Sequence, residues 1–299
     1  MEVLKINNLY KVFKTKGKKV NALNGMDFSV NKGEILGFLG PNGAGKSTTI
    51  KSIMDLIRPD SGNIKIMGID SRVVEARKHI GFMPENPQYF DTLTGKGLLM
   101  FTTSIFNMNK KEAEKKADEL LEEFELQDAA KRPIRNYSKG MIQRIGFAAA
   151  IIHAPEALIL DEPMSGLDPM GRVLFKKKLL DLNKNGATIF FSSHIIPDIE
   201  DICSRVLIVN KGKVISDLSR EEIKYSTTTG FNVITKNPVD IKEIHFEKIS
   251  DELYKSYCKK DQLIELLEKI RETKIEIVDI EPVKKDLEDI FVEIAGGRL

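Results

Sequence analysis

The spacing of apolar residues along the chain alternates between the strand and the helix period. Residues 2–39 alternate between apolar and polar side chains, which predicts strands separated by turns at 16–18 and 24–25. Short apolar runs predict further buried strands at 80–83, 157–160 and 187–191. Helical spacing follows at 50–57, over much of 93–153 and at 173–183. The segment 157–191 is therefore a strand–helix–strand unit, and the core is predicted to be α/β with a parallel sheet and a helical lobe inserted at 93–150.

The pattern changes after Gly212, which indicates a second domain. Residues 226–230 are typical of a linker, and strands are expected at 231–235 and 275–283, with a helix at 261–273. A last helix is expected where four apolar residues share one face: Leu287, Ile290, Phe291 and Ile294. We therefore predict a main domain at 1–225 and a small α/β appendix at 226–299. The appendix shows no catalytic or metal pattern, which favours a stabilising cap or a dimer contact over a ligand sensor.

Composition narrows the class of protein. The chain has 299 residues, of which 41% are hydrophobic and 30% charged, as in ordinary globular proteins. A net charge of +2 gives no support to a nucleic-acid partner. Two distant cysteines, Cys203 and Cys258, argue against a disulfide framework or a zinc site and favour a reducing cytoplasm. The start lacks the pattern of a signal peptide, and no apolar run approaches the length that crosses a bilayer, so any membrane-spanning part is expected on another chain.

One stretch fits the P-loop pattern, in which two glycines five apart are followed by Lys and Ser. Its residues are Gly40, Pro41, Asn42, Gly43, Ala44, Gly45, Lys46, Ser47 and Thr48. Glycines let successive backbone N–H groups point inward at phosphate oxygens, and the following helix places its positive end there. Lys46 can reach the β- and γ-phosphates, and the Ser47 hydroxyl can bind Mg²⁺. The stretch lies between a predicted strand and a predicted helix, which supports nucleotide binding.

Two acids, Asp161 and Glu162, follow the apolar strand at 157–160 directly. Ligands of open parallel sheets gather at the carboxyl ends of the strands, where these acids fall. Asp161 is expected to hold Mg²⁺ through water together with Ser47, and Glu162 to orient or deprotonate the attacking water. A solvated turn carrying two acids is the alternative, and the P-loop weighs against it.

Two further positions are less distinctive by themselves. Ser138 is a candidate N-cap for a helix that begins near Gly140, although a capped surface helix has the same pattern. His194 directly follows the buried strand at 187–191, at the ligand-binding edge of the sheet, which favours a γ-phosphate contact. The other three histidines are interpreted as structural.

Together these motifs resemble the ATP-binding subunit of ABC transporters over residues 1 to about 220. The resemblance implies a P-loop NTPase fold, with a RecA-like core, an N-terminal antiparallel β subdomain and an inserted helical subdomain. It also implies specific roles. Ser138 and Gly140 occupy the signature motif, Asp168 the D-loop, His194 the switch position, and Phe13 the place of an aromatic residue that stacks on adenine. Glu85 stands where the family usually has the Q-loop glutamine.

The chain departs from the common family pattern at three positions. Lys139 and Met141 differ from the commonest signature but are similar to the variant of ABC-2-type exporters, as is the closing segment 286–291. Glu85 replaces an amide, so it can approach Mg²⁺ through water but cannot donate an amide hydrogen bond. The site residues implied for ATP and Mg²⁺ therefore include Glu85, while its part in coupling to transport stays open.

The resemblance implies how such a subunit works. Two ATPase subunits, as a homodimer or a heterodimer, hold ATP between the P-loop of one and the signature of the other, and drive a multi-span membrane permease from the cytoplasmic face. Export is the expected direction. Two alternatives stay open: a soluble ABC protein acting on ribosomes or DNA, and a nucleotide sensor without turnover. A single P-loop without heptads or a cysteine cluster weighs against the first.

Overall fold

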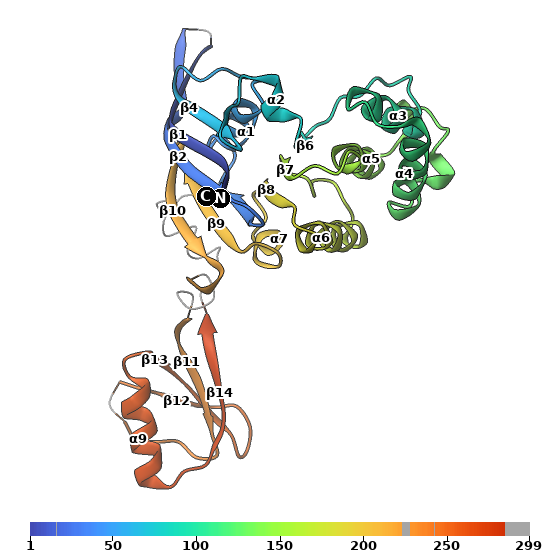
Figure 1. The fold of residues 1–299 in the computed structure, drawn as a ribbon. Helices are drawn as coiled ribbons and strands as arrows, with labels where there is room; N and C mark the ends of the chain where they lie inside the picture. The colour runs from blue at the N-terminus through green and yellow to red at the C-terminus, as the bar shows by residue number, and fades with distance from the viewer. Residues whose placement is uncertain (16, 223–227, 242, 285–299) are drawn as a thin grey trace. The chain divides into compact units, whose positions relative to one another are not determined.

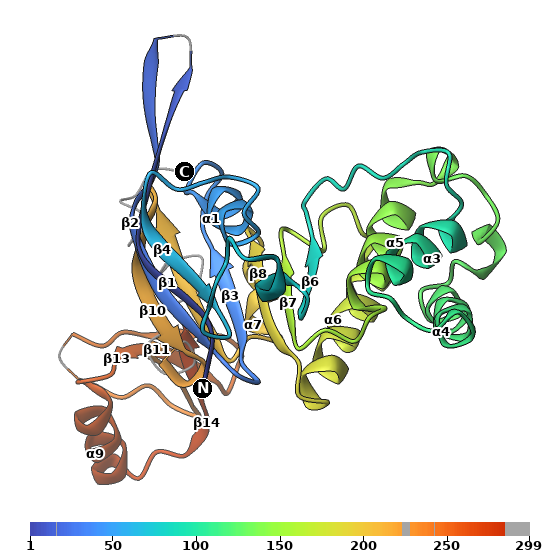
Figure 2. The same cartoon turned by 45° about the horizontal axis from the view of Figure 1, so that its top comes forward.

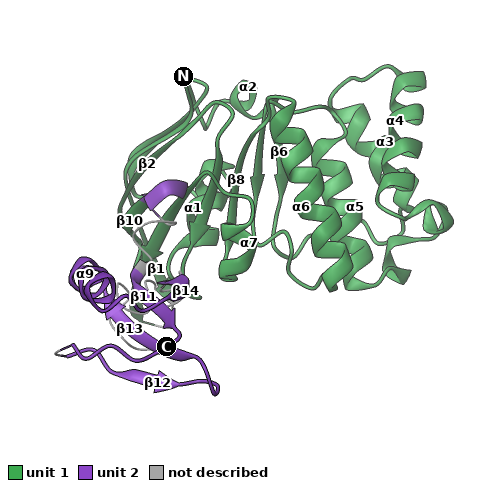
Figure 3. Cartoon of the chain, turned by 90° about the horizontal axis from the view of Figure 1, so that it is seen from below, with its two compact units in different colours: residues 1–217 green, residues 218–299 purple. Residues whose placement is uncertain are grey.

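The computed structural model describes residues 1–15, 17–222, 228–241 and 243–284. The chain divides into two compact units, residues 1–217 and 218–299, drawn in two colours in Figure 3. This division falls shortly before the boundary at 225/226 that the sequence predicts. The helix expected around Leu287 and the closing segment 286–291 lie outside the described residues. No helix within the described part is long and apolar enough to cross a membrane.

The first unit begins with an antiparallel sheet in the order β2-β1-β4-β5. Its strands are β1 (Glu2–Thr15), β2 (Lys18–Asn31), β4 (Ser61–Ile66) and β5 (Ile69–Asp70). The turn predicted at 24–25 is wrong, because both residues lie inside β2. Leu9 pairs with Met26 and Tyr10 with Asn24, so Gly25 is an extra residue in a β-bulge and adopts a φ of +84°. Gly25 therefore does mark a break in the regular strand backbone, but the break is a bulge within β2 and not a turn between two strands.

The second sheet has six strands in the order β10-β9-β3-β8-β7-β6 (Figure 1). They are β3 (Ile35–Leu39), β6 (Ile80–Met83), β7 (Ala157–Leu160), β8 (Thr188–Ser193), β9 (Arg205–Asn210) and β10 (Lys213–Ser219). The pairs β9–β3, β3–β8, β8–β7 and β7–β6 are parallel, which confirms the predicted α/β core. Every residue of β3, β7 and β8 is buried, and of these three strands only β8 carries polar side chains, at Thr188, Ser192 and Ser193. Their carboxyl ends meet at one edge of the sheet.

A helical lobe leaves the sheet after β6, as Figure 2 shows, and confirms the predicted insertion. Its helices are α3 (Gly95–Ile105), α4 (Lys110–Glu123) and α5 (Lys139–Ile151), with short 3₁₀ turns at Gln127–Ala129 and Ile134–Asn136. Thr94, Asn109 and Ser138 cap the three helices by accepting hydrogen bonds from first-turn N–H groups. The remaining helices of this unit are α1 (Lys46–Ile53), α2 (Val74–Arg77), α6 (Pro169–Lys184) and α7 (Ile196–Glu200).

Three phenylalanines join the two sheets of the first unit. Phe28 of β2, Phe38 of β3 and Phe190 of β8 have ring centroids 5.2 to 5.5 Å apart. All three side chains are buried, and aromatic contacts of this kind add to the free energy gained from apolar burial. Through Phe38, the strand that precedes the P-loop is therefore packed against both the first sheet and the neighbouring strand β8.

An ion-pair network ties α6 to α7. Asp198, only 2% exposed, lies 3.0 Å from Arg172 Nη1 and 2.9 Å from Lys176 Nζ. Lys176 also contacts Asp201, which is exposed, at 2.7 Å. The network holds α7, the helix that follows His194, against α6.

Asp198→Asn is expected to lower the free energy of unfolding by about 2 kcal/mol, because two partly buried cations lose a buried counter-charge. Urea denaturation measures the change. Asp201→Asn, which removes an exposed carboxylate from the same network, should cost less than about 1 kcal/mol. Equal losses for the two variants would contradict the assignment.

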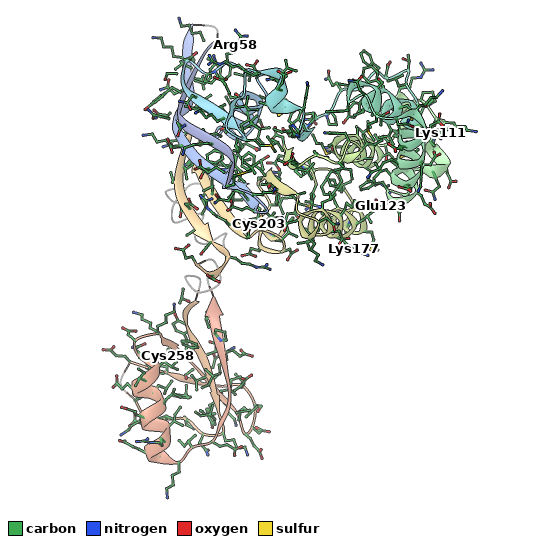
Figure 4. The ribbon with its side chains drawn as sticks, in the orientation of Figure 1. Arg58, Lys111, Glu123, Lys177, Cys203 and Cys258 are labelled. Carbon is green, nitrogen blue, oxygen red and sulfur yellow. The ribbon has the colours of Figure 1, made fainter. Side chains whose placement is uncertain are left out.

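Within the described residues, the second unit contains an antiparallel sheet in the order β12-β13-β11-β14, against which helix α9 packs. Its elements are β11 (Thr228–Thr235), β12 (Phe246–Lys248), β13 (Tyr254–Lys259), α9 (Leu263–Thr273) and β14 (Ile277–Lys284). Leu266 and Ile270 of α9 form a buried core with Val233 and Cys258. Residues 228–230, predicted as linker, belong to β11, because Gly230 pairs with both neighbouring strands. Cys203 and Cys258 lie in different units (Figure 4).

Candidate nucleotide site

The loop between β3 and α1 can only be built from glycine at several positions. Gly43 and Gly45 have φ values of +82° and +106°, in the left-handed region that side chains disfavour. A Cβ at Gly45 would lie 2.7 Å from the Ala22 carbonyl oxygen, and one at Gly40 would lie 2.5 Å from that of Val209. The loop is therefore packed closely against β2 and β9 and leads into α1, whose first N–H groups form a site that favours an anion.

Lys46 is the first residue of α1 and is 6% exposed. Its Nζ donates a hydrogen bond of 2.6 Å to the Gly40 carbonyl and lies 3.3 Å from Glu162 Oε1. The ammonium is thus held inside the loop by a carbonyl and a carboxylate. A buried cation beside a helix N-terminus favours an anionic ligand.

A hydroxyl on each side holds the Asp161 carboxylate. Ser47 Oγ and Ser192 Oγ donate to Asp161 Oδ1 over 3.3 and 2.7 Å, and Ser192 Oγ also accepts from the Glu162 N–H at 2.9 Å. Burial raises the pKa of the Asp161 carboxyl, and the two hydroxyl donors oppose this rise. Ser192 is not among the residues predicted from the sequence. It is fully buried near the end of β8, next to Ser193.

Glu162 lies between a cation and an imidazole, in a strained backbone conformation. Its φ is +48°, although it is not glycine, and such a conformation costs about 1–3 kcal/mol. His194 Nδ1 lies 2.8 Å from Glu162 Oε2, and in the tautomer with a proton on Nδ1 the imidazole donates to this carboxyl oxygen. Glu162 is 7% exposed, whereas the His194 side chain is 49% exposed. The carboxylate is therefore oriented by Lys46 on one oxygen and by His194 on the other.

A cleft of about 370 Å³ opens over these groups, within the size range of ligand sites. It is lined by Phe13, Val20, Ala22, Pro41, Asn42, Gly43, Gly45, Lys46, Ser47, Thr48, Glu85, Glu162 and His194. The structure thus brings together most of the P-loop with Phe13, Glu85, Glu162 and His194. Asp161 reaches the site through its hydrogen bond with Ser47.

Six sequence-predicted site residues do not line this cleft: Gly40, Ala44, Asp161, Ser138, Gly140 and Asp168. Ser138 Oγ accepts from the Met141 N–H at 3.3 Å, and Asp168 Oδ1 accepts from the Gly171 N–H at 2.7 Å, so both cap helices. Gly140 faces Gly166, whose carbonyl oxygen is the nearest atom to an added Cβ, at 3.7 Å. The roles assigned to these residues at the nucleotide stay predictions.

The sequence is similar to that of known ATP-binding proteins of ABC transporters. The family model for ABC transporters matches residues 23–165. The linearmycin resistance ATP-binding protein LnrL of Bacillus subtilis (strain 168) is 33% identical, over 99% of this chain and 99% of its own length. The bacitracin transport ATP-binding protein BcrA of Bacillus licheniformis is 35% identical, over 99% of this chain and 98% of its own.

A solved structure shares the fold and shows a nucleotide. It is the dimeric post-hydrolysis state of the ATP-binding cassette MJ0796 bound to ADP and Pi, with a TM-score of 0.67 and 25% identity, covering 73% of this chain and 98% of that one. The chain therefore belongs to the ABC transporter family, as an ATP-binding subunit that hydrolyses ATP.

Proposed function

We propose that this chain forms one half of a dimer that closes around ATP, with a second copy or a related subunit, and powers export through a membrane permease on another chain. The pair would act at the cytoplasmic face of the cell membrane. One observation carries the proposal. A single copy holds most of the P-loop and Glu162 in one cleft, with Asp161 hydrogen-bonded to Ser47 beside it, while Ser138 and Gly140 do not line the cleft. A second copy that presents these residues would complete the site.

Within the cleft, the side chains suggest how the nucleotide lies. The triphosphate would follow the P-loop N–H groups, with Lys46 at the β- and γ-phosphates and Phe13 stacked on adenine. Ser47 and Asp161 supply the hydroxyl and carboxylate oxygens that Mg²⁺ prefers, and they are already within hydrogen-bond distance at 3.3 Å. Glu85 could contribute through water. A bound Mg²⁺ would neutralise charge that develops on the phosphates.

The hydrolytic step is assigned to the carboxylate next to Asp161. Glu162 would accept a proton from, or orient, the water that attacks the γ-phosphate. His194 holds Oε2 of this carboxylate through Nδ1. With both ring nitrogens protonated, it would also donate from Nε2 to the γ-phosphate. Lys46 holds the other oxygen at 3.3 Å and would shift to the phosphates when ATP binds.

Export is supported by the two relatives that match along their whole length, one named for linearmycin resistance and one for bacitracin transport. The signature variant with Lys139 and Met141 supports the same direction. Co-purification of a multi-span permease from detergent-solubilised membranes would test the partner.

Gly140→Asp tests the closing of two copies around ATP. The new side chain fits within a single copy, because the nearest atom to its Cβ would be 3.7 Å away. We expect ATP affinity of the isolated copy to change less than about twofold, ATP-dependent dimers to be lost, and turnover to fall about 10²-fold, since a carboxylate would face a phosphate. Size-exclusion chromatography with light scattering and a phosphate-release assay measure these effects.

Gln127→Asp is the matched control for Gly140→Asp. It introduces the same charge on an exposed residue of the helical lobe and should leave all three measurements unchanged. Unaltered dimerisation and turnover in Gly140→Asp would refute the proposal. Equal loss of ATP binding by the isolated copy would instead show that Gly140 acts within its own fold.

A further inference from the structure

Gln143 connects three parts of the first unit through one side-chain amide. It lies on α5, three residues after Gly140, and is fully buried. Its Nε2 donates two hydrogen bonds of 3.1 Å, one to the Glu85 carbonyl and one to the Ser165 carbonyl. The loops after β6 and β7 are thereby fixed to the helix that carries the signature residues.

The orientation of this amide follows from its partners. The reverse assignment would place Oε1 against two carbonyl oxygens, which cannot donate. In the assigned orientation Oε1 is buried and makes no hydrogen bond to any residue in the described ranges. An apolar side chain would fill the same space without burying an unpaired oxygen. The presence of a glutamine at this position is therefore explained by the two hydrogen bonds that its NH₂ group donates, and not by packing.

Both carbonyls belong to loops that carry acids of the cleft. Glu85 itself lines the cleft with its side chain. The Ser165 N–H donates to the Glu162 carbonyl at 3.0 Å and closes the turn in which Glu162 has its left-handed φ. Ser192 holds the N–H of Glu162 at the other end of this turn. Gln143 is thus one of the groups that fix the backbone on which Glu162 is presented.

We propose that Gln143 is a positioning residue, which holds the Glu85 and Glu162 loops of its own copy in a fixed relation to its signature helix. The proposal rests on the proposed function, because that helix meets a nucleotide only in the second copy. When Ser138 and Gly140 contact the ATP of the second copy, α5 would be fixed in position. Through the hydrogen bonds of Gln143, the loops that carry Glu85 and Glu162 in its own cleft would then be fixed as well. Each site would then be completed by an event at the other.

The test compares two substitutions in the full chain. Gln143→Leu keeps a similar volume without donors, and Gln143→Glu keeps the shape but replaces the NH₂ group with oxygen. For both we expect ATP affinity of the isolated copy, and ATP-dependent dimer formation in the Glu162→Gln background, to stay within about threefold. We expect kcat to fall about 10- to 10²-fold, because the acids lose their alignment. Gln143→Glu should lose at least as much as Gln143→Leu.

Gln127→Leu, at an exposed glutamine of the same lobe, is the control and should change none of the three quantities. A wild-type kcat in both Gln143 variants would overturn the inference. So would a loss of kcat that only follows a loss of dimers, since that would show a structural role in α5. Absence of ATP-dependent dimers with an intact Gln143 would count against the proposed function itself.

Discussion

Lys46→Ala is expected to lower kcat/KM for ATP about 10²–10³-fold, the largest effect at the nucleotide-binding end of the cleft. The ammonium is almost fully buried between the Gly40 carbonyl and Glu162, so water cannot replace it easily. Without it, the phosphates would also face the uncompensated charge of Glu162. Binding of a fluorescent ATP analogue and steady-state phosphate release measure the two parts of the effect.

Lys51→Ala is the control for this prediction, because Lys51 lies on the same helix and is exposed. It should leave affinity and turnover within about twofold, since exposed charges act weakly over this distance. Unchanged affinity and turnover in Lys46→Ala would remove the basis of the nucleotide site, whatever the other motifs show.

Glu162→Gln is expected to lower kcat about 10²–10⁴-fold while ATP affinity is retained. The amide keeps the size of the side chain but cannot accept a proton from water. ATP should therefore bind and accumulate unhydrolysed, and the dimer that we propose should become stable enough to isolate. Single-turnover hydrolysis and light scattering with ATP measure these outcomes.

The control for Glu162→Gln is Glu156→Gln, at a half-exposed residue that pairs with His79 just before β7. It should change turnover less than about twofold, because the pair is on the surface. Wild-type turnover in Glu162→Gln would assign the proton acceptor elsewhere. Failure of ATP to trap a dimer would argue against closure of two copies.

The parts of the site that the sequence could predict are those set by local residue type. The P-loop needs glycine at Gly43 and Gly45 for its backbone, and the acids Asp161 and Glu162 follow an apolar strand whose bounds are those of β7. Both features depend only on residues that are close together in the chain, so they can be recognised from the order of residue types. The parallel sheet then brings the two segments together at one edge.

The parts that could not be predicted depend on residues distant in the chain. Ser192 reaches Asp161 from a neighbouring strand, and Gln143 reaches two loops from a helix, without any spacing that marks them. Gly25 is a bulge only because β1 pairs with β2 on both sides of it. Asp168 illustrates a further limit, since the single copy shows it only as a helix cap, and its role at a nucleotide stays a prediction.

At Glu162, the residue that we assign to ATP hydrolysis also has a strained backbone, so it lowers the stability of the folded protein. Glycine, or to a lesser degree asparagine, would relieve the left-handed φ, and a protein selected only for thermal endurance would gain from either. The chain instead has glutamate at this position, so the folded protein is less stable by the strain energy of the left-handed φ. Engineering toward higher heat tolerance should therefore leave this turn alone, because its strain and its chemistry belong to the same residue.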